Sequence, residues 1–182
     1  ATTERVKMIY VIPDFQNPTG RTWSLERRLK FMEIINKYEI PVIEDNPYGE
    51  LYFNEAPPVS IKSMDTENIV IYAGSFSKVL APGLRVGWCV APKTLIAKFT
   101  AIKQTQDVHS NILAQMIAYK FITEYDFEGH LEKLRQLYDK YKNRMYITAC
   151  KVLHDPQRAE DAVHDAFIAI AGNLDKIDDV DS

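Results

Sequence analysis

The chain contains 182 residues, of which 46% are hydrophobic, 26% charged and 11% aromatic, and its net charge at pH 7 is −3. These values are typical of a globular chain that is long enough to bury a core. Nine prolines and seven glycines are too few for a disordered or fibrous chain. No apolar run reaches the roughly 20 residues of a membrane-spanning helix, and the first residues show no signal peptide. We therefore expect a cytoplasmic protein with no membrane partner.

The side chains give little support to a metal-binding or nucleic-acid-binding protein. The two cysteines, Cys89 and Cys150, are widely separated, and the four histidines form no HxxxH or HxH pair, so we expect a reducing compartment and no metal site. Residues 155–182 carry eight acidic side chains against two basic ones. This acidic end argues against a nucleic-acid-binding tail, and we expect no direct contact with nucleic acid.

Four short apolar runs predict the strands of a sheet, and an amphipathic segment between the first two predicts a helix from residue 25 to about 38, capped by Ser24. A strand, a helix and a strand form a βαβ unit, so the first strands should be parallel. The helix places these apolar residues on one face: Leu25, Leu29, Met32 and Ile35. The predicted strands span residues 7–12, 40–43, 69–73 and 86–90.

The link between the third and fourth strands, residues 74–85, contains Pro82 and Gly83, which disfavour a continuous helix. A parallel return needs a longer helical crossover, so the fourth strand is predicted to be antiparallel. From Thr94 onward the pattern is helical, and a last helix begins at Asp155-Pro156 and should end at Gly172. The fold class is α/β: a partial mixed sheet of three parallel strands and one antiparallel strand, followed by an all-helical C-terminal segment.

Four polar residues fall at one edge of this predicted sheet. Asn17, Asp45 and Lys78 follow the first three strands, and Arg85 precedes the antiparallel fourth strand. Ligands of open α/β sheets bind outside the carboxyl ends of the strands, so these side chains can converge on one small-molecule site.

This combination suits a phosphorylated aldehyde cofactor with a basic ring nitrogen. A lysine amine can form an imine with the aldehyde, and a carboxylate can keep the ring nitrogen protonated, which lets the ring accept electrons. Arg85 and the hydroxyls of Ser75 and Ser77 can bind the phosphate through charge-assisted hydrogen bonds. The predicted cofactor is pyridoxal 5′-phosphate.

Three motifs, each after a predicted strand, resemble the fold-type I aminotransferases of class I/II. They are Asn-Pro-Thr-Gly at 17–20, Asp-Asn-Pro-Tyr at 45–48 and Ser-Phe-Ser-Lys-Val-Leu-Ala-Pro-Gly-Leu-Arg-Val-Gly at 75–87. The resemblance is to the branch that contains 2-aminoadipate and aromatic aminotransferases and the aminotransferase-like half of MocR regulators. It runs from about residue 6 to about 135 and implies the large, cofactor-binding domain of that fold.

The resemblance implies a role for each matching residue. Lys78 would be the lysine that forms the imine with the cofactor and moves the proton at the substrate α-carbon. Asp45 would pair with the ring nitrogen, and Tyr48 and Asn17 would hydrogen-bond the phenolic oxygen. Ser75, Ser77 and Arg85 would hold the phosphate. The implied reaction moves an amino group between an amino acid and a 2-oxo acid, and a homodimer is expected by analogy with the family.

Each of these residues has an ordinary alternative when it is taken alone. Asn-Pro-Thr-Gly is commonly only a turn, Asp45 could cap a helix, Arg85 could pair with any carboxylate, and a lysine after a strand is commonly a solvated surface residue. The segment before Lys78 is not a P-loop, because no glycine precedes the lysine and Val79 follows it. Tyr10, Tyr52 and Tyr72 are interpreted as core or sheet-surface aromatics.

The resemblance covers well under half of a family member. It lacks the N-terminal part with further phosphate contacts and the small C-terminal domain with the arginine for the substrate carboxylate. We therefore expect this chain to be inactive alone.

Residues 137–182 do not continue the aminotransferase pattern. They resemble region 2 of sigma-70-family RNA polymerase sigma factors, chiefly its early helices, and the promoter-reading helix of that region is absent. We thus predict two domains, 1–136 and 137–182, in a fusion of two truncated pieces. The alternative function is a helical module that contacts the RNA polymerase core, and the structural alternative is a plain helical hairpin packed on the α/β part.

Overall fold

The protein, seen here in a computed structural model, is described for residues 6–17, 19–52 and 55–171. Two short 3₁₀ helices, η1 (Lys62–Met64) and η2 (Pro82–Leu84), lie in the connections. The strands are β1 (Ile9–Val11), β2 (Val42–Asp45), β3 (Val70–Ser75) and β4 (Gly87–Val90). The helices are α1 (Leu25–Tyr38), α2 (Lys93–Gln106), α3 (Ile112–Glu124), α4 (Phe127–Leu153) and α5 (Pro156–Ala171).

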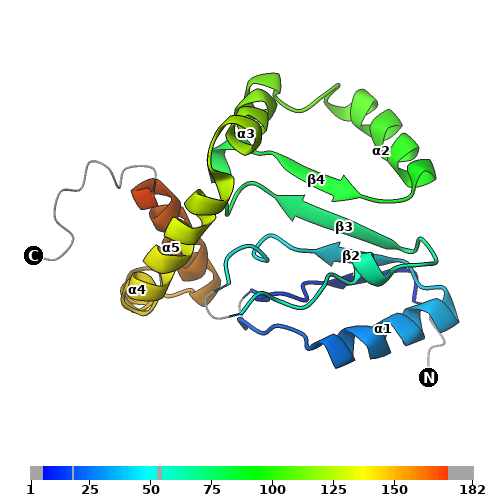
Figure 1. The fold of residues 1–182 in the computed structure, drawn as a ribbon, viewed down its shortest axis with the longest axis horizontal. Helices are drawn as coiled ribbons and strands as arrows, with labels where there is room; N and C mark the ends of the chain where they lie inside the picture. The colour runs from blue at the N-terminus through cyan, green and yellow to red at the C-terminus, as the bar shows by residue number, and fades with distance from the viewer. Residues whose placement is uncertain (1–5, 18, 53–54, 172–182) are drawn as a thin grey trace, which may run out of the picture.

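The four strands form one sheet in the order β1-β2-β3-β4 (Figure 1). β1, β2 and β3 are parallel, and β4 pairs antiparallel with β3, so the predicted mixed sheet is confirmed. The connection before β4 contains η2 with Pro82 at its start, which is too short to carry the chain back for a parallel return. β2 begins two residues later than predicted, after Pro41, which cannot donate a backbone hydrogen bond.

α1 covers one face of the sheet and forms the first buried core with it. Met32 and Ile35 pack against Val42 of β2 and Val70 of β3. Its bounds agree with the prediction, and the Ser24 hydroxyl accepts a hydrogen bond from the Arg27 amide at 3.3 Å.

The buried face of α1 is turned relative to the predicted one. Met32 and Ile35 are buried as predicted, but Leu25 and Leu29 are about half exposed, and Arg28 is fully buried in their place. Its guanidinium forms an ion pair with the buried Asp14 carboxylate. A charged residue therefore occupies a position where periodicity alone favours a leucine.

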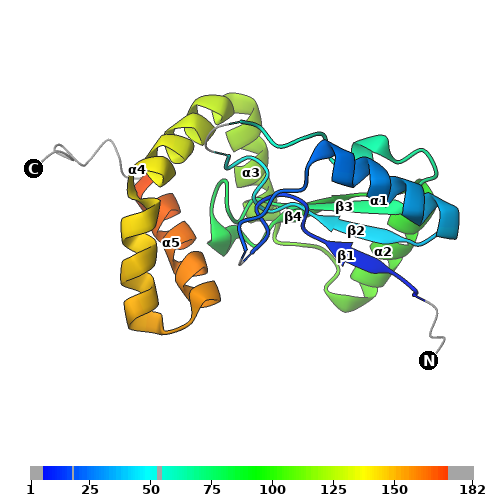
Figure 2. The same ribbon diagram turned by 90° about the horizontal axis from the view of Figure 1, so that it is seen from below.

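α4 and α5 form a helical hairpin beside the carboxyl ends of the parallel strands (Figures 1 and 2). α4 continues through residues 136 and 137, where the sequence predicts a domain boundary. The Asp155 carboxylate caps α5 by accepting the amides of Gln157 at 2.9 Å and Arg158 at 3.1 Å. The predicted end at Gly172, and the last residues of the sigma-like segment, lie outside the described residues. The second buried core joins the hairpin to the loops after β2 and β3: Leu51, Val79, Leu131, Leu134, Tyr138, Val163 and Phe167.

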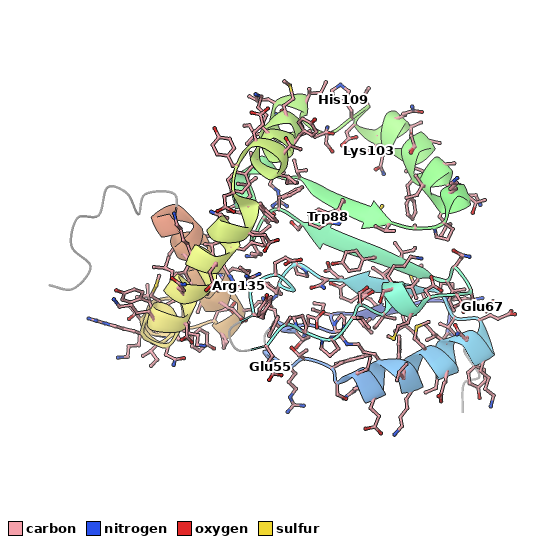
Figure 3. The ribbon with its side chains drawn as sticks, in the orientation of Figure 1. Glu55, Glu67, Trp88, Lys103, His109 and Arg135 are labelled. Carbon is pink, nitrogen blue, oxygen red and sulfur yellow. The ribbon has the colours of Figure 1, made fainter. Side chains whose placement is uncertain are left out.

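The β4–α2–α3 region is much more open. All four residues of β4 are exposed, and none of the described residues of α2 is buried. Trp88, labelled on β4 in Figure 3, lies against Gly74 of β3, where a Cβ atom would come within 2.3 Å of the indole. None of the helices in the described part of the chain is long and apolar enough to cross a membrane.

Candidate functional site

The structure brings the predicted polar residues to one edge of the sheet. Asp45 ends β2 and Ser75 ends β3, while Asn17 lies in the loop after β1. Lys78 follows β3 by three residues, and Arg85 precedes β4. Because β4 is antiparallel, its first residues lie beside the last residues of β3, with Ser75 opposite Gly87. The site therefore lies at the carboxyl edge of the parallel strands, as expected for an open α/β sheet.

Asp45 has a partner that the sequence interpretation missed. The Tyr10 hydroxyl donates to Asp45 Oδ2 at 2.5 Å, and burial together with this carboxylate raises the pKa of Tyr10 to about 12. The register contains the signal for this contact. Tyr10 pairs with Ile43, and Asp45 lies two residues further along on the same face. Tyr10 is thus a neighbour of the candidate site rather than only a sheet-surface aromatic.

Asn17 and Tyr48 form a second pair. The Asn17 amide nitrogen donates to the Tyr48 hydroxyl at 3.3 Å, and burial raises the pKa of Tyr48. Asn17 Oδ1 is buried and has no hydrogen-bond partner within residues 6–17, 19–52 and 55–171. Since buried polar atoms are normally satisfied, this oxygen has hydrogen-bonding capacity left for a ligand.

The predicted phosphate-binding residues also lie together. Ser75 Oγ accepts the Ser77 amide at 3.0 Å, and Arg85 donates from Nη1 to Ser77 Oγ at 3.5 Å and to the Pro82 carbonyl at 3.3 Å. Arg85 holds a left-handed backbone conformation, with φ of 53° and ψ of 40°. Two hydroxyls and a guanidinium at one turn form a donor set that suits a phosphate group.

Lys78 contacts a residue from the far end of the chain. Its Nζ lies 3.2 Å from Asp161 Oδ1 of α5, and the two side chains are 13% and 51% exposed. One turn further along α5, the His164 ring stacks on the Tyr48 ring, with centroids 5.1 Å apart and an interplanar angle of 28°. Sequence reasoning missed both α5 residues, because a contact across 83 positions leaves no periodic signal.

His164 is itself held by a tyrosine of α4. A hydrogen bond joins the Tyr138 hydroxyl to His164 Nδ1. Burial, with the nearby Lys78 charge, lowers the pKa of His164 to about 4. The imidazole is therefore neutral near pH 7 and can pack against Tyr48 without bringing a second positive charge beside Lys78.

A cavity of about 480 Å³ lies between the loop after β1 and the hairpin. Tyr48 is the only predicted site residue in its lining, and the hairpin contributes Tyr138, Glu160 and His164. The space beside Tyr48 is therefore shared between the sheet edge and α5. No group of three His, Cys, Asp or Glu side chains that could hold a metal ion occurs among the residues that the structure describes.

The fold and this donor set define an α/β protein with a candidate small-molecule site at the carboxyl edge of its sheet. The sequence matches the family model of class I and II aminotransferases over residues 2–149, and the chain belongs to that family. The match extends past residue 136, into the segment predicted to resemble a sigma factor.

Named relatives agree with this assignment. The chain is 40% identical over 142 residues to the aromatic-amino-acid aminotransferase 1 of Thermococcus litoralis, which covers 78% of this chain and 34% of that protein. Kynurenine aminotransferase of Pyrococcus horikoshii, solved in complex with PMP, is similar to this chain with a TM-score of 0.75 and 37% sequence identity. The similarity covers 81% of this chain and 36% of the chain of that enzyme. The chain thus spans about a third of the length of the relatives it matches.

A third relative bears on the cofactor. The α-aminoadipate aminotransferase LysN of Thermus thermophilus, solved with N-(5′-phosphopyridoxyl)-L-leucine, has a TM-score of 0.72 at 38% identity, covering 79% of this chain and 37% of its own. The family and these complexes imply pyridoxal phosphate as the cofactor. The donor set fits it, because an amine, a carboxylate, an unsatisfied amide oxygen and a cationic turn lie at one sheet edge.

Proposed function

We propose that this chain supplies the cofactor-binding part of a pyridoxal-phosphate-dependent aminotransferase, which moves an amino group between an amino acid and a 2-oxo acid. The observation that carries the proposal is the convergence of Asn17, Asp45, Lys78 and Arg85 at one sheet edge in a member of the class I and II family. The mixed sheet supports the same function. Because β4 is antiparallel to β3, the turn with Arg85 before β4 lies at the same sheet edge as Lys78 after β3.

The proposed roles follow from the donor types. Lys78 binds the cofactor aldehyde through its amine and moves the proton at the substrate α-carbon. Asp45 holds the ring nitrogen protonated, with its orientation supported by the Tyr10 hydroxyl. Tyr48 and Asn17 hydrogen-bond the phenolic oxygen. When bound, pyridoxal phosphate supplies the electron sink for the α-carbon chemistry.

The phosphate is assigned to the turn between β3 and β4. Ser75, Ser77 and Arg85 are proposed to bind it, and the Arg85 donation to Ser77 Oγ supports this grouping. Arginine suits this role because its planar guanidinium can donate two parallel hydrogen bonds to phosphate oxygens.

Substrates and assembly are proposed by similarity. The relatives carry the names of aromatic amino acid, kynurenine and α-aminoadipate aminotransferases, so we propose an amino acid with a 2-oxo acid partner and a homodimer as the complete enzyme. Because the chain spans about a third of those relatives, we expect it to bind the cofactor without turning over substrate alone.

Covalent labelling tests the proposal. The chain is mixed with pyridoxal phosphate, borohydride fixes the lysine–aldehyde adduct as a secondary amine, and peptide mapping locates the label. We expect Lys78 to be labelled and Lys78→Arg, which keeps the charge, to lose the label at least tenfold. Lys103→Arg, in an exposed pair with Asp107, is the matched control and should label as the original chain does. Labelling that is equal in the original chain and in Lys78→Arg would contradict the proposal.

The helical module that contacts the RNA polymerase core stays a prediction, and the comparisons lend it no support. The hairpin alternative describes the observed α4–α5 packing instead. A pull-down of core polymerase with the chain tests the prediction, with Phe167→Asp as the control that detaches α5 from α4.

A further inference from the structure

The last helix lies on the residues assigned to the cofactor. Asp161 pairs with Lys78, and His164 stacks on Tyr48. Asp161 and His164 are three residues apart on one face of α5. Together they contact Lys78, the proposed covalent residue, and Tyr48, which is proposed to bind the cofactor ring. α5 therefore occupies part of the same site that pyridoxal phosphate needs.

The hairpin that carries α5 is attached to the sheet edge on several sides. Arg135 of α4, labelled in Figure 3, donates from Nε to the Glu50 carbonyl at 2.9 Å and lies 4.1 Å over the ring of Tyr52. His130 Nε2 hydrogen-bonds the Val79 carbonyl at 2.9 Å, next to Lys78 in the chain. These contacts hold α4 against the loops that follow β2 and β3.

α5 packs on α4 mainly through apolar side chains. Ala159 and Phe167 are completely buried, and the Phe167 ring lies 3.9 Å from that of Tyr138. The adjoining side of α5 then meets the site with Asp161 and His164, and His164 also hydrogen-bonds Tyr138 of α4. The position of the acidic and imidazole groups at the site is thus set by core packing, not by the ion pair alone.

The contacts of α5 exclude those of a bound cofactor. An ammonium paired with a carboxylate has no lone pair with which to attack an aldehyde, so Lys78 must leave Asp161 before it reacts. The His164 ring stacks on the ring of Tyr48, whose hydroxyl is assigned to the phenolic oxygen, so α5 lies against a second proposed cofactor-binding residue. Lys78 cannot pair with Asp161 and bind the cofactor aldehyde at once, and His164 restricts the space beside Tyr48.

We propose that α5 closes the cofactor site, and that pyridoxal phosphate and α5 compete for Lys78 and for the space beside Tyr48. This inference rests on the proposed function and adds a regulation of the same site. The protein exists in a closed form with α5 docked and an open form with α5 displaced. The apparent dissociation constant for pyridoxal phosphate equals the intrinsic one divided by the fraction of open molecules. By linkage, cofactor binding must release α5 by the same factor.

Variants of the full chain test the competition. In Asp161→Asn the half-saturating concentration of pyridoxal phosphate for borohydride-fixed labelling of Lys78 should fall about two- to fivefold, as expected for a partly exposed ion pair. In Asp161→Asn/His164→Ala it should fall about tenfold, because the ring stacking is lost as well. Asp165→Asn removes the same charge from an exposed position one turn along α5, so it should label like the original chain.

Hydrogen exchange supplies a second readout that does not depend on activity. Saturating pyridoxal phosphate should speed the exchange of amides in residues 156–167 while those of α1 stay unchanged. Equal half-saturation in all variants, or α5 amides that keep their protection in the loaded protein, would overturn the competition and leave the proposed function standing. No label at Lys78 in any variant, the double variant included, would overturn the proposed function and the competition together.

Discussion

Two ion pairs in this protein use similar groups in different surroundings. Arg28 and Asp14 lie beneath α1 with exposed fractions of 0% and 1%, while Lys78 and Asp161 join the site to α5 with Asp161 half exposed. Arg28 makes further hydrogen bonds, from Nε to the Trp23 carbonyl and from Nη1 to the Val59 carbonyl, each at 3.2 Å. Among the described residues, Lys78 has one such contact, to a carboxylate that water can also reach.

The difference shows how burial decides what an ion pair does. A charge without access to water must keep its partner, because an unpaired buried charge costs several kcal/mol. A half-exposed partner can be replaced by water or by a ligand at little cost. The first pair thus belongs to the fold, and the second is suited to exchange. Two predictions test this contrast directly, and a third concerns His164, whose imidazole lies beside the second pair.

The largest effect is expected for the buried pair. Arg28→Met keeps much of the side-chain volume and leaves Asp14 without its cation, so the free energy of unfolding should fall by about 3–5 kcal/mol. Urea unfolding followed by circular dichroism measures it. Lys30→Met breaks an exposed pair with Glu26 on the same helix and should cost less than about 1 kcal/mol. Similar losses in the two variants would show that burial is not the deciding factor.

The next effect is a pH dependence at the hairpin. The unfolded imidazole of His164 takes up a proton below about pH 6.5. The folded one stays neutral until its pKa of about 4, because burial and the Lys78 charge oppose protonation. The unfolded state therefore binds more protons between these values, and stability that is complete above pH 6.5 is lost as the pH falls towards 4, by up to about 3 kcal/mol.

Comparison of variants isolates this contribution. His164→Phe keeps an aromatic ring on Tyr48 and has no group that titrates, so its urea-unfolding free energy should depend less on pH than that of the original chain. His109→Gln changes an exposed histidine in the α2–α3 connection and should leave the original profile intact (Figure 3). A profile that His164→Phe does not flatten would contradict the assignment.

The smallest effect is expected for the exchangeable pair. Asp161→Asn should lower the free energy of unfolding by less than about 1 kcal/mol, since the carboxylate is half exposed. Differential scanning calorimetry at neutral pH detects the change as a small shift in Tm. A loss as large as that of Arg28→Met would place Lys78–Asp161 among the pairs that hold the fold.

Local patterns predicted much of the α/β part. The bounds of α1 follow from Ser24 and from apolar spacing, and the antiparallel β4 follows from a short link with Pro82. Met32 and Ile35 of the predicted α1 face are buried, but Leu25 and Leu29 are not, because Arg28 is buried through its long-range partner Asp14 rather than through hydropathy. Periodicity reports which side chains are apolar, not which charges find partners.

The residues of the candidate site also fall into those that the sequence predicts and those that it does not. Residues that follow strands could be placed at one edge from topology, and Tyr10 could have been added from the parallel register. The α5 contacts could not, because nothing near Asp161 or His164 in the sequence indicates Lys78 or Tyr48 as neighbours. The packing of Ala159, Val163 and Phe167 on α4, together with the Tyr138–His164 hydrogen bond, orients α5 against the sheet edge.

The left-handed backbone at Arg85 has a consequence for any attempt to stabilise this protein. A glycine would adopt that conformation without the steric cost of roughly 1–2 kcal/mol that an L-residue meets there. It would also remove the guanidinium next to Ser77. Selection for thermal stability alone would therefore favour glycine at position 85, whereas selection for anion binding would favour arginine. The arginine found there is consistent with selection for anion binding.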